Sequence, residues 1–215
     1  MYKRQATDSE KGFFGGITAF IVEKAEAGFR IGQRFEKMGL RTSPIGELIF
    51  EDVFVSSENV VGQTGQGGAI FNYSMQWERA GIAALHVGTM QRLLETAAGY
   101  AKNRRQGGQV IGKHQAVAHK IADMKIRYEA ARLLGYKAAA TLQSSRPDAM
   151  PISVAKTFVS EALVKTAADA MQIMGGNGYM ADYEVERAMR DAMAGTIYSG
   201  TSEVQRNIIA GMMGV

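Results

Sequence analysis

The sequence lacks cysteine altogether, which excludes disulfide bridges and metal sites built from thiolates, and leaves the redox compartment open. It also lacks any apolar run near the ~20 residues that a helix needs to cross a bilayer. Its first residues contain no apolar core of the kind that marks a signal peptide. These absences lead us to expect a cytoplasmic protein that makes no membrane contact.

A strong charge of either sign is missing as well. The formal net charge is +4, from 25 basic and 21 acidic residues that are interspersed along the chain. That balance is typical of a solvated surface and argues against a nucleic-acid-binding face. The small positive excess still suits an anionic small molecule.

Several kinds of catalytic centre are not supported by the residues present. The three histidines, His86, His114 and His119, are scattered without carboxylates at the spacing of metal ligands, so we expect no metal site. No G-x-S-x-G motif marks a serine-hydrolase nucleophile. The GGNGY run that begins at Gly175 follows a helical pattern and not a strand, which argues against a Rossmann dinucleotide loop.

The first part of the chain, from Gly16 to Val61, has the pattern of β-strands. Residues 17–23 are rich in β-branched and aromatic residues, a short strand FRIGQ follows, and residues 46–55 alternate with a slip at Glu51 and Asp52 that predicts a bulge. So few strands cannot bury both faces or cover their edges. We therefore interpret residues 1–61 as the later part of a larger β domain.

The opening MYKRQ fits neither a strand nor a helix cap, and we treat residues 1–5 as possibly non-native and outside the fold. Further on, the glycine-rich residues 62–68 read as a linker, because the apolar period changes from two to about three and a half after them.

Residues 69–215 have a helical pattern throughout. The second helix carries apolar residues at alternating steps of four and three, as the seam of a helix bundle requires, and a stripe of the third is also expected to be buried. The expected stripes are Val117, Ile121, Met124, Tyr128 and Ala131 in the second helix, and Ala155, Val159, Ala162, Thr166 and Ala170 in the third. Short loops between long helices predict an antiparallel four-helix bundle. The fold class is thus α+β, mainly α, with helices expected at about 69–103, 112–142, 152–174 and 183–194, and from Thr201 or Ser202 to 212.

The loop before the last helix is the most informative stretch. Gly200 supplies a residue with free φ, and Thr201 or Ser202 can cap the helix that follows. A capped helix start offers free N–H groups and the positive end of a dipole, which suits a phosphate or a carbonyl oxygen. Taken alone, however, the loop is better interpreted as an ordinary helix–loop–helix corner.

Six blocks in order give the loop a context. They are TAFIVE, KMGLRTSPIGELIFEDVFV, WER, RRQGGQVIGKHQAVAHKIADM, QIMGGNGY and IYSGTSEVQRN. Together they closely resemble the acyl-CoA dehydrogenases, over nearly the whole chain after MYKRQ. The resemblance implies an FAD-dependent enzyme that dehydrogenates the α,β bond of an acyl thioester in fatty acid or amino acid catabolism. Such an enzyme has a helical N-terminal domain, a central β domain and a C-terminal four-helix bundle.

The same resemblance implies partners and cofactor contacts. It predicts a homo-oligomer, a tetramer, and an electron-transfer flavoprotein or other acceptor. Arg104 matches the arginine that reaches the FAD pyrophosphate of a neighbouring subunit, and charge pairing with phosphate explains the residue type. The other positions that match the cofactor side are Gln106, Gln115, Gln172, Gly175, Gly176, Thr201 and Glu203.

Two positions depart from the family pattern. The family usually has phenylalanine where this chain has Gly107, so an aromatic contact is lost and two adjacent glycines are expected to loosen the loop. Many members also carry the catalytic glutamate directly before Gly-Thr, where this chain has Ser199. A serine hydroxyl is not a base of comparable strength.

A base is nevertheless required to remove the α-proton. Some members place the glutamate on the first bundle helix, and Glu78 matches that position, directly before the substrate-side Arg79. We therefore predict Glu78 as the base, with Arg79, Ser199 and Gly200 on the substrate side. A serine in the loop with a glutamate on the helix also resembles, more weakly, the dehydrogenases of carrier-protein-bound thioesters.

A second hypothesis is a non-catalytic bundle of the same descent that only assembles with partners. Arg104, Gln172 and Gly176 favour the enzyme, because an assembly module has no need of them. The β region that begins midway through a domain favours the assembly role for this chain by itself, which we expect to be inactive alone. A DNA- or membrane-binding bundle has no basic face to support it.

Overall fold

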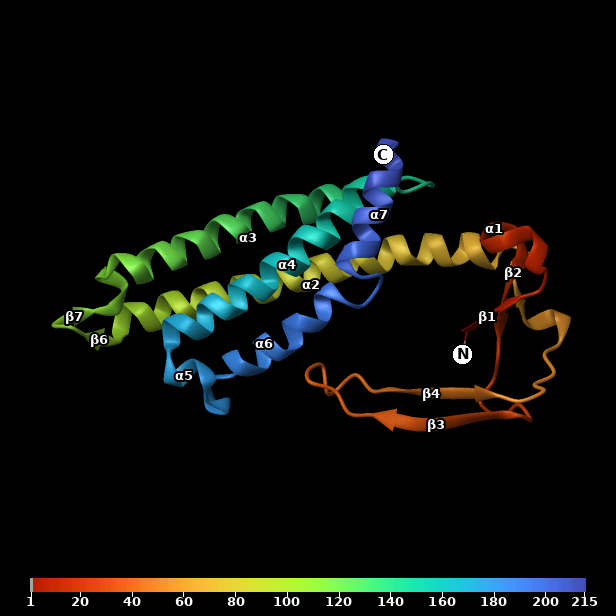
Figure 1. Cartoon of the computed structure of the whole chain (residues 1–215), viewed down its shortest axis with the longest axis horizontal. Coiled ribbons are helices and arrows are strands. Elements are labelled where there is room, and N and C mark those ends of the chain that lie inside the picture. Colours follow the sequence, from red (N-terminus) through yellow and green to blue (C-terminus); the bar gives the residue numbers. More distant parts are fainter. Residues whose placement is uncertain (1) are drawn as a thin grey trace. The chain divides into compact units, whose positions relative to one another are not determined.

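The computed structural model describes residues 2–215, and the side chains from residue 5 onward. The chain forms two compact units, whose elements are labelled in Figure 1. The first comprises the residues up to Lys37 together with Arg41–Met75, and the second comprises Met38–Leu40 and Gln76–Val215. The boundary between them lies within the helix α2, Gly67–Asn103, and not in the segment 62–68 that the glycine content indicated.

The first unit is built from short antiparallel strands. One sheet has the order β1-β2-β5, and β3 pairs separately with β4. A helical turn, α1, Gly12–Gly16, joins the first two strands. The strands are β1 Tyr2–Ala6, β2 Ile17–Ile21, β3 Phe29–Phe35, β4 Ile45–Phe50 and β5 Val60–Val61.

Two sequence-based expectations for this unit are wrong. The opening residues belong to a strand, since Tyr2–Ala6 pairs along its whole length with Ile17–Ile21. Because ladder hydrogen bonds come from the backbone, a polar segment can form an edge strand without alternating apolar residues. The expected bulge at Glu51 and Asp52 is absent: β4 ends at Phe50, and the irregular register lies in β3 between Ile31 and Arg34.

The second unit is a helix bundle whose expected helices are all present. Their ends follow from local chemistry: Asp148 caps the start of α4, and Gly175, with φ of +59°, ends it. The elements after α2 are the hairpin strands β6 Arg105–Gln106 and β7 Gln109–Val110, and the helices α3 Gln115–Thr141, α4 Ala149–Met174, α5 Gly176–Tyr179, α6 Val185–Met193 and α7 Ser202–Met213.

The core of the bundle lies between α2, α3, α4 and α6. Met90 and Leu93 of α2, Met124 of α3 and Val159 of α4 are fully buried in it, and Val185 of α6 closes it. The stripes predicted for the two middle helices are confirmed in the structure. Buried or packed against the core, as predicted, are Val117, Ile121, Met124, Tyr128, Ala131, Val159, Ala162 and Ala170, and Ala155 and Thr166 are also buried.

Candidate functional site

The turn that precedes α7 has an unusual backbone. Ser199 adopts φ of +56° and Gly200 follows with φ of +86°, so both residues are in the left-handed region. Glycine enters this region freely, whereas a residue with a side chain does so at a cost of about 1 kcal/mol or more. Thr201 then caps α7, its hydroxyl accepting from the Val204 N–H at 3.3 Å. The expected cap is therefore present.

Three buried side chains donate hydrogen bonds to the backbone carbonyl oxygens of this turn. Arg79 Nε donates to the Ser199 carbonyl oxygen at 3.0 Å, and Lys156 Nζ donates to the Gly200 carbonyl oxygen at 2.8 Å. The amide of Gln205 donates to both oxygens. Burial, and then the nearby Arg79 charge, lower the pKa of Lys156 below its ordinary value. The two cations are thus committed to the turn, and the Arg79 side chain faces its backbone.

Glu78 lies on the open side of the same turn. It is exposed, directly before the buried Arg79 on α2, and its Oε1 accepts a hydrogen bond from the Ser199 hydroxyl. Four residues predicted from the sequence as catalytic or substrate-side, namely Glu78, Arg79, Ser199 and Gly200, therefore come together at one place. A carboxylate fixed at an open turn is suited to accept a proton from a ligand.

A buried histidine lies next to this group. His86 Nε2 is 2.7 Å from the Tyr198 hydroxyl oxygen, and the other ring nitrogen, Nδ1, is 3.5 Å from Ser160 Oγ. The ring leaves no room for a side chain at Gly195, where an added Cβ would approach Cε1 to 2.6 Å. Burial, together with the Lys156 charge, lowers the pKa of His86 to about 4. His86 is therefore neutral at pH 7.

This pKa gives a testable pH dependence. His86 takes up its proton near pH 6.5 when unfolded but only near pH 4 when folded, so the unfolded chain binds more protons in that window. Its contribution to stability is complete above pH 6.5 and is lost as the pH falls towards 4. We expect His86→Gln to remove about 2 kcal/mol of the stability difference between pH 7 and pH 5, measured by urea unfolding. His119→Gln, at an exposed histidine, is the control and should leave that difference unchanged.

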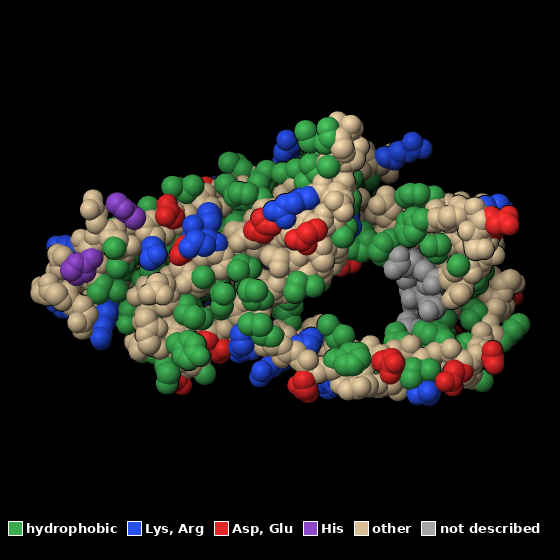
Figure 2. Space-filling model, in the orientation of Figure 1, with side chains coloured by type: hydrophobic (Ala, Val, Ile, Leu, Met, Phe, Trp, Pro, Cys, Tyr) green, Lys and Arg blue, Asp and Glu red, His purple; other side chains and the backbone are tan. Residues whose placement is uncertain are grey.

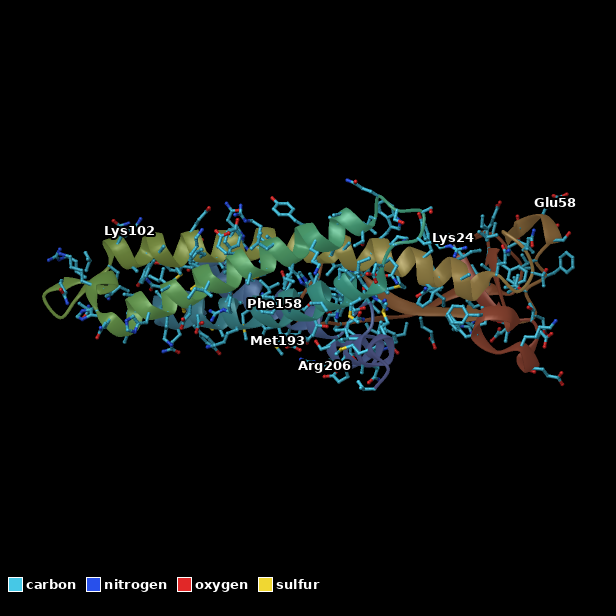
Figure 3. The ribbon with its side chains drawn as sticks, turned by 90° about the horizontal axis from the view of Figure 1, so that it is seen from above. Lys24, Glu58, Lys102, Phe158, Met193 and Arg206 are labelled. Carbon is cyan, nitrogen blue, oxygen red and sulfur yellow. The ribbon has the colours of Figure 1, made fainter. Side chains whose placement is uncertain are left out.

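A second group of predicted residues lines a cavity of about 360 Å³ at the hairpin end of the bundle, where Lys102 is labelled in Figure 3. Arg104, Gln106, Gly175 and Gly176 all contribute to its wall. An added Cβ at either glycine would meet nothing within 4 Å, so the backbone there is open to a ligand. The cavity therefore combines one guanidinium with accessible backbone, which suits a phosphate group.

The hairpin beside this cavity is regular. Gly107 and Gly108, with φ of +61° and +80°, form the two-residue turn between the paired strands β6 and β7. His114 braces it, with Nε2 3.0 Å from the Gln106 carbonyl oxygen and Cε1 3.3 Å from where a Gly107 Cβ would lie. The two glycines thus close a hairpin, in contrast to the loosened loop that the sequence suggested.

Four predicted cofactor residues lie outside this cavity wall. Gln115 begins α3 and Gln172 lies near the end of α4, and both are exposed. Thr201 and Glu203 belong to the start of α7, beside the Ser199 turn. Hydrogen bonds from its own backbone N–H and from Thr201 lower the pKa of Glu203. Within one chain, the predicted cofactor residues therefore do not form a single cluster.

Sequence reasoning missed the residues that support the turn. Lys156, His86, Tyr198 and Gln205 were not singled out, although all contact the turn or its neighbours. One signal was available for Lys156: it is three residues before Val159 and seven before Leu163, on an apolar face of α4 where lysine is rare.

Other kinds of site find no support in residues 2–215. No group of three or more metal-ligating side chains could hold an ion there. No helix among these residues is both long and apolar enough to span a membrane. A larger cavity of about 620 Å³ lies in the first unit, lined by apolar side chains such as Phe20, Leu48 and Phe50 and by none of the predicted site residues.

Comparison with known proteins identifies relatives of this chain. Residues 65–214 match the family model "Acyl-CoA dehydrogenase, C-terminal domain". The chain is 41% identical over 195 residues to L-prolyl-[peptidyl-carrier protein] dehydrogenase of Pseudomonas fluorescens, covering 91% of this chain and 51% of that protein. It is 42% identical over 207 residues to the short-chain specific acyl-CoA dehydrogenase of Megasphaera elsdenii, covering 96% and 54%.

A solved structure entitled "PigA with FAD and proline" shares the fold, with a TM-score of 0.95 and 36% identity over 98% of this chain and 55% of that one. The chain therefore spans about half the length of the curated relatives that it matches.

Proposed function

Because the chain belongs to the acyl-CoA dehydrogenase family, we propose that it supplies the C-terminal part of an FAD-dependent enzyme that dehydrogenates the α,β bond of an acyl thioester. The observation that carries this proposal is the Glu78 carboxylate held at the Ser199 turn. An exposed carboxylate with a defined orientation can act as a general base, and the turn has the backbone geometry to receive a ligand.

In the proposed reaction Glu78 accepts the α-proton of the thioester. The electron pair left on the α-carbon becomes the α,β double bond, and FAD, when bound, would accept the hydride that leaves the β-carbon. Ser199 and Gly200 lie on the substrate side of the turn. Arg79 acts through the turn, because its guanidinium faces the Ser199 carbonyl oxygen and is only 7% exposed. This revises the substrate contact expected for Arg79 from the sequence.

The residues present fit part of an FAD molecule. Arg104 and Gln106 offer donors for the pyrophosphate, and Gly175 and Gly176 let phosphate or sugar approach the backbone. Gly175 must be glycine on conformational grounds, with φ of +59°. Gln115, Gln172, Thr201 and Glu203 are proposed as contacts of the same cofactor from elsewhere on the bundle.

Replacing Arg104 with Gln in the full-length enzyme is expected to weaken FAD binding by ~10-fold to 100-fold, the scale of one lost charge-assisted hydrogen bond to phosphate. The dissociation constant is measured by flavin fluorescence during reconstitution of the apoenzyme. The neighbouring Arg105→Gln is the control, since the Arg105 guanidinium donates to the Gly108 carbonyl oxygen within the hairpin. Equal losses in the two variants would contradict a specific role for Arg104.

The substrate class is an acyl thioester carried either by CoA or by a carrier protein. Of the two relatives, one is named a dehydrogenase of a carrier-protein-bound prolyl group and the other an acyl-CoA dehydrogenase. Ser199 before Gly-Thr, together with Glu78 on the helix, supports the carrier-bound substrate for this chain. The function is tested by mixing the full-length enzyme with butyryl-CoA or with a prolyl-loaded carrier protein and recording loss of flavin absorbance. No bleaching with either class of thioester would refute the proposal.

We also propose that the bundle self-associates, as a homotetramer, and that an electron-transfer flavoprotein reoxidises the enzyme. Support for self-association comes from α3, where Ile126, Leu133 and Tyr136 are exposed at steps of seven and three along one face. The space-filling view shows apolar side chains among interspersed charges on the bundle (Figure 2). An assembly role by itself would not require the Glu78 and Arg104 groups.

A further inference from the structure

Ser199 pays a conformational cost that glycine at the same position would avoid. It is one of four non-glycine residues with positive φ in the described chain, and Gly200 beside it shows that glycine is used where only the turn matters. The Ser199 side chain makes an interaction that glycine could not make. Among the described residues, the Ser199 hydroxyl donates a hydrogen bond to Glu78 Oε1.

The backbone of the turn is fixed independently of that hydroxyl. Arg79, Lys156 and Gln205 hold the carbonyl oxygens of Ser199 and Gly200, and Lys156 and Gln205 are fully buried. The hydrogen bonds of Arg79 and Lys156 go to these backbone oxygens, while Glu78 attracts the Arg79 charge and Glu203 attracts the Lys156 charge at longer range. These hydrogen bonds to the backbone fix the position of the Ser199 hydroxyl before any ligand binds.

We propose that Ser199 is a positioning residue for the Glu78 carboxylate, and that the buried cations Arg79 and Lys156 fix the turn which presents its hydroxyl. The proposal rests on the proposed function, in which Glu78 is the base. A glutamate side chain has three rotatable bonds, and a hydrogen bond to Oε1 restricts them while leaving Oε2 free for the proton. The same contact makes residue 199 unsuited to a second carboxylate while Glu78 is charged.

The test compares two variants in which the Tm of the protein and the positioning of Glu78 are expected to change in opposite directions. Ser199→Gly removes the hydroxyl and relieves the positive φ, whereas Ser199→Thr keeps the hydroxyl and adds a β-branch that tolerates positive φ poorly. In the full-length enzyme we expect Ser199→Gly to keep or raise the Tm and to lower kcat by about tenfold, with KM and FAD content unchanged. Ser199→Thr should lower the Tm and retain most of kcat.

Glu184→Gly is the matched control, because Glu184 has φ of +58° and stands at the N-cap position of α6 without a side-chain capping hydrogen bond, and its ion pair with Arg187 is on the surface. It should change the Tm as Ser199→Gly does and leave kcat unchanged. A purely structural role for Ser199 predicts that rate and Tm follow the same order in all variants, and that result would overturn the proposal. So would a Ser199→Gly enzyme with the parent kcat.

Failure of the proposed function gives a different result. In that case the parent enzyme itself dehydrogenates no acyl thioester, whatever residue occupies position 199. Crystal structures of the parent and of Ser199→Gly then test the contact without turnover: the Glu78 carboxylate should lie against the hydroxyl in the parent and move in the variant. An unmoved carboxylate would refute positioning, even in an active enzyme.

Discussion

Glu78→Gln in the full-length enzyme is expected to slow the reduction of FAD by a saturating thioester by about 100-fold or more. Glutamine keeps the shape of the side chain and can still accept the Ser199 hydrogen bond through Oε1, but it has no basicity. The loss therefore reports the base and leaves the turn in place. Stopped-flow absorbance of the flavin measures the rate, and the FAD content of the purified protein should equal that of the parent.

Two further results sharpen this prediction. Adding Ser199→Glu to the Glu78→Gln variant moves the carboxylate to the turn and should restore part of the rate. Glu203→Gln is the comparison, at a carboxylate that we propose as a cofactor contact and that its own backbone N–H and Thr201 stabilise in the charged form. If Glu78→Gln reduces flavin as fast as the parent does, another group must be the base.

The sequence predicted the group around Glu78 because its members belong to two short blocks. Glu78 and Arg79 are adjacent on one helix, and Ser199 and Gly200 are adjacent in one turn, so a single contact between the blocks assembles all four. Lys156 and His86 could not be found in this way. Each is an isolated polar residue in a helical pattern, and only the packing of α2 and α4 against the turn shows what it contacts.

The helices were predicted more accurately than the strands for a physical reason. A bundle helix shows its buried face in its own sequence, as Met124, Tyr128 and Ala131 do in α3. A strand owes its existence to its partner, and so β1 was missed although it pairs throughout with β2. The boundary predicted from the glycines of residues 62–68 lies before the division that the structure shows within α2. Gly67 belongs to the first turn of α2, where an added Cβ would approach the Ile17 carbonyl oxygen to 2.8 Å, so this glycine allows close packing.

The largest expected loss of stability comes from a cavity in the bundle core. Leu93 of α2 is fully buried among Met124, Val159 and other apolar side chains. Leu93→Ala removes apolar contact and leaves a space that the packed helices can fill only in part. We expect it to lower the free energy of unfolding by about 2–5 kcal/mol, measured by urea unfolding followed through helical circular dichroism.

The same substitution at an exposed position of α2 is the control. Leu85 lies on the same helix but is 72% exposed, so Leu85→Ala loses little buried area and should change the unfolding free energy by less than about 0.5 kcal/mol. Alanine has the higher helix propensity of the two residues, which excludes a helix-forming effect as the cause of any loss at Leu93. Equal effects of the two substitutions would mean that the core does not lie between α2, α3 and α4 as described.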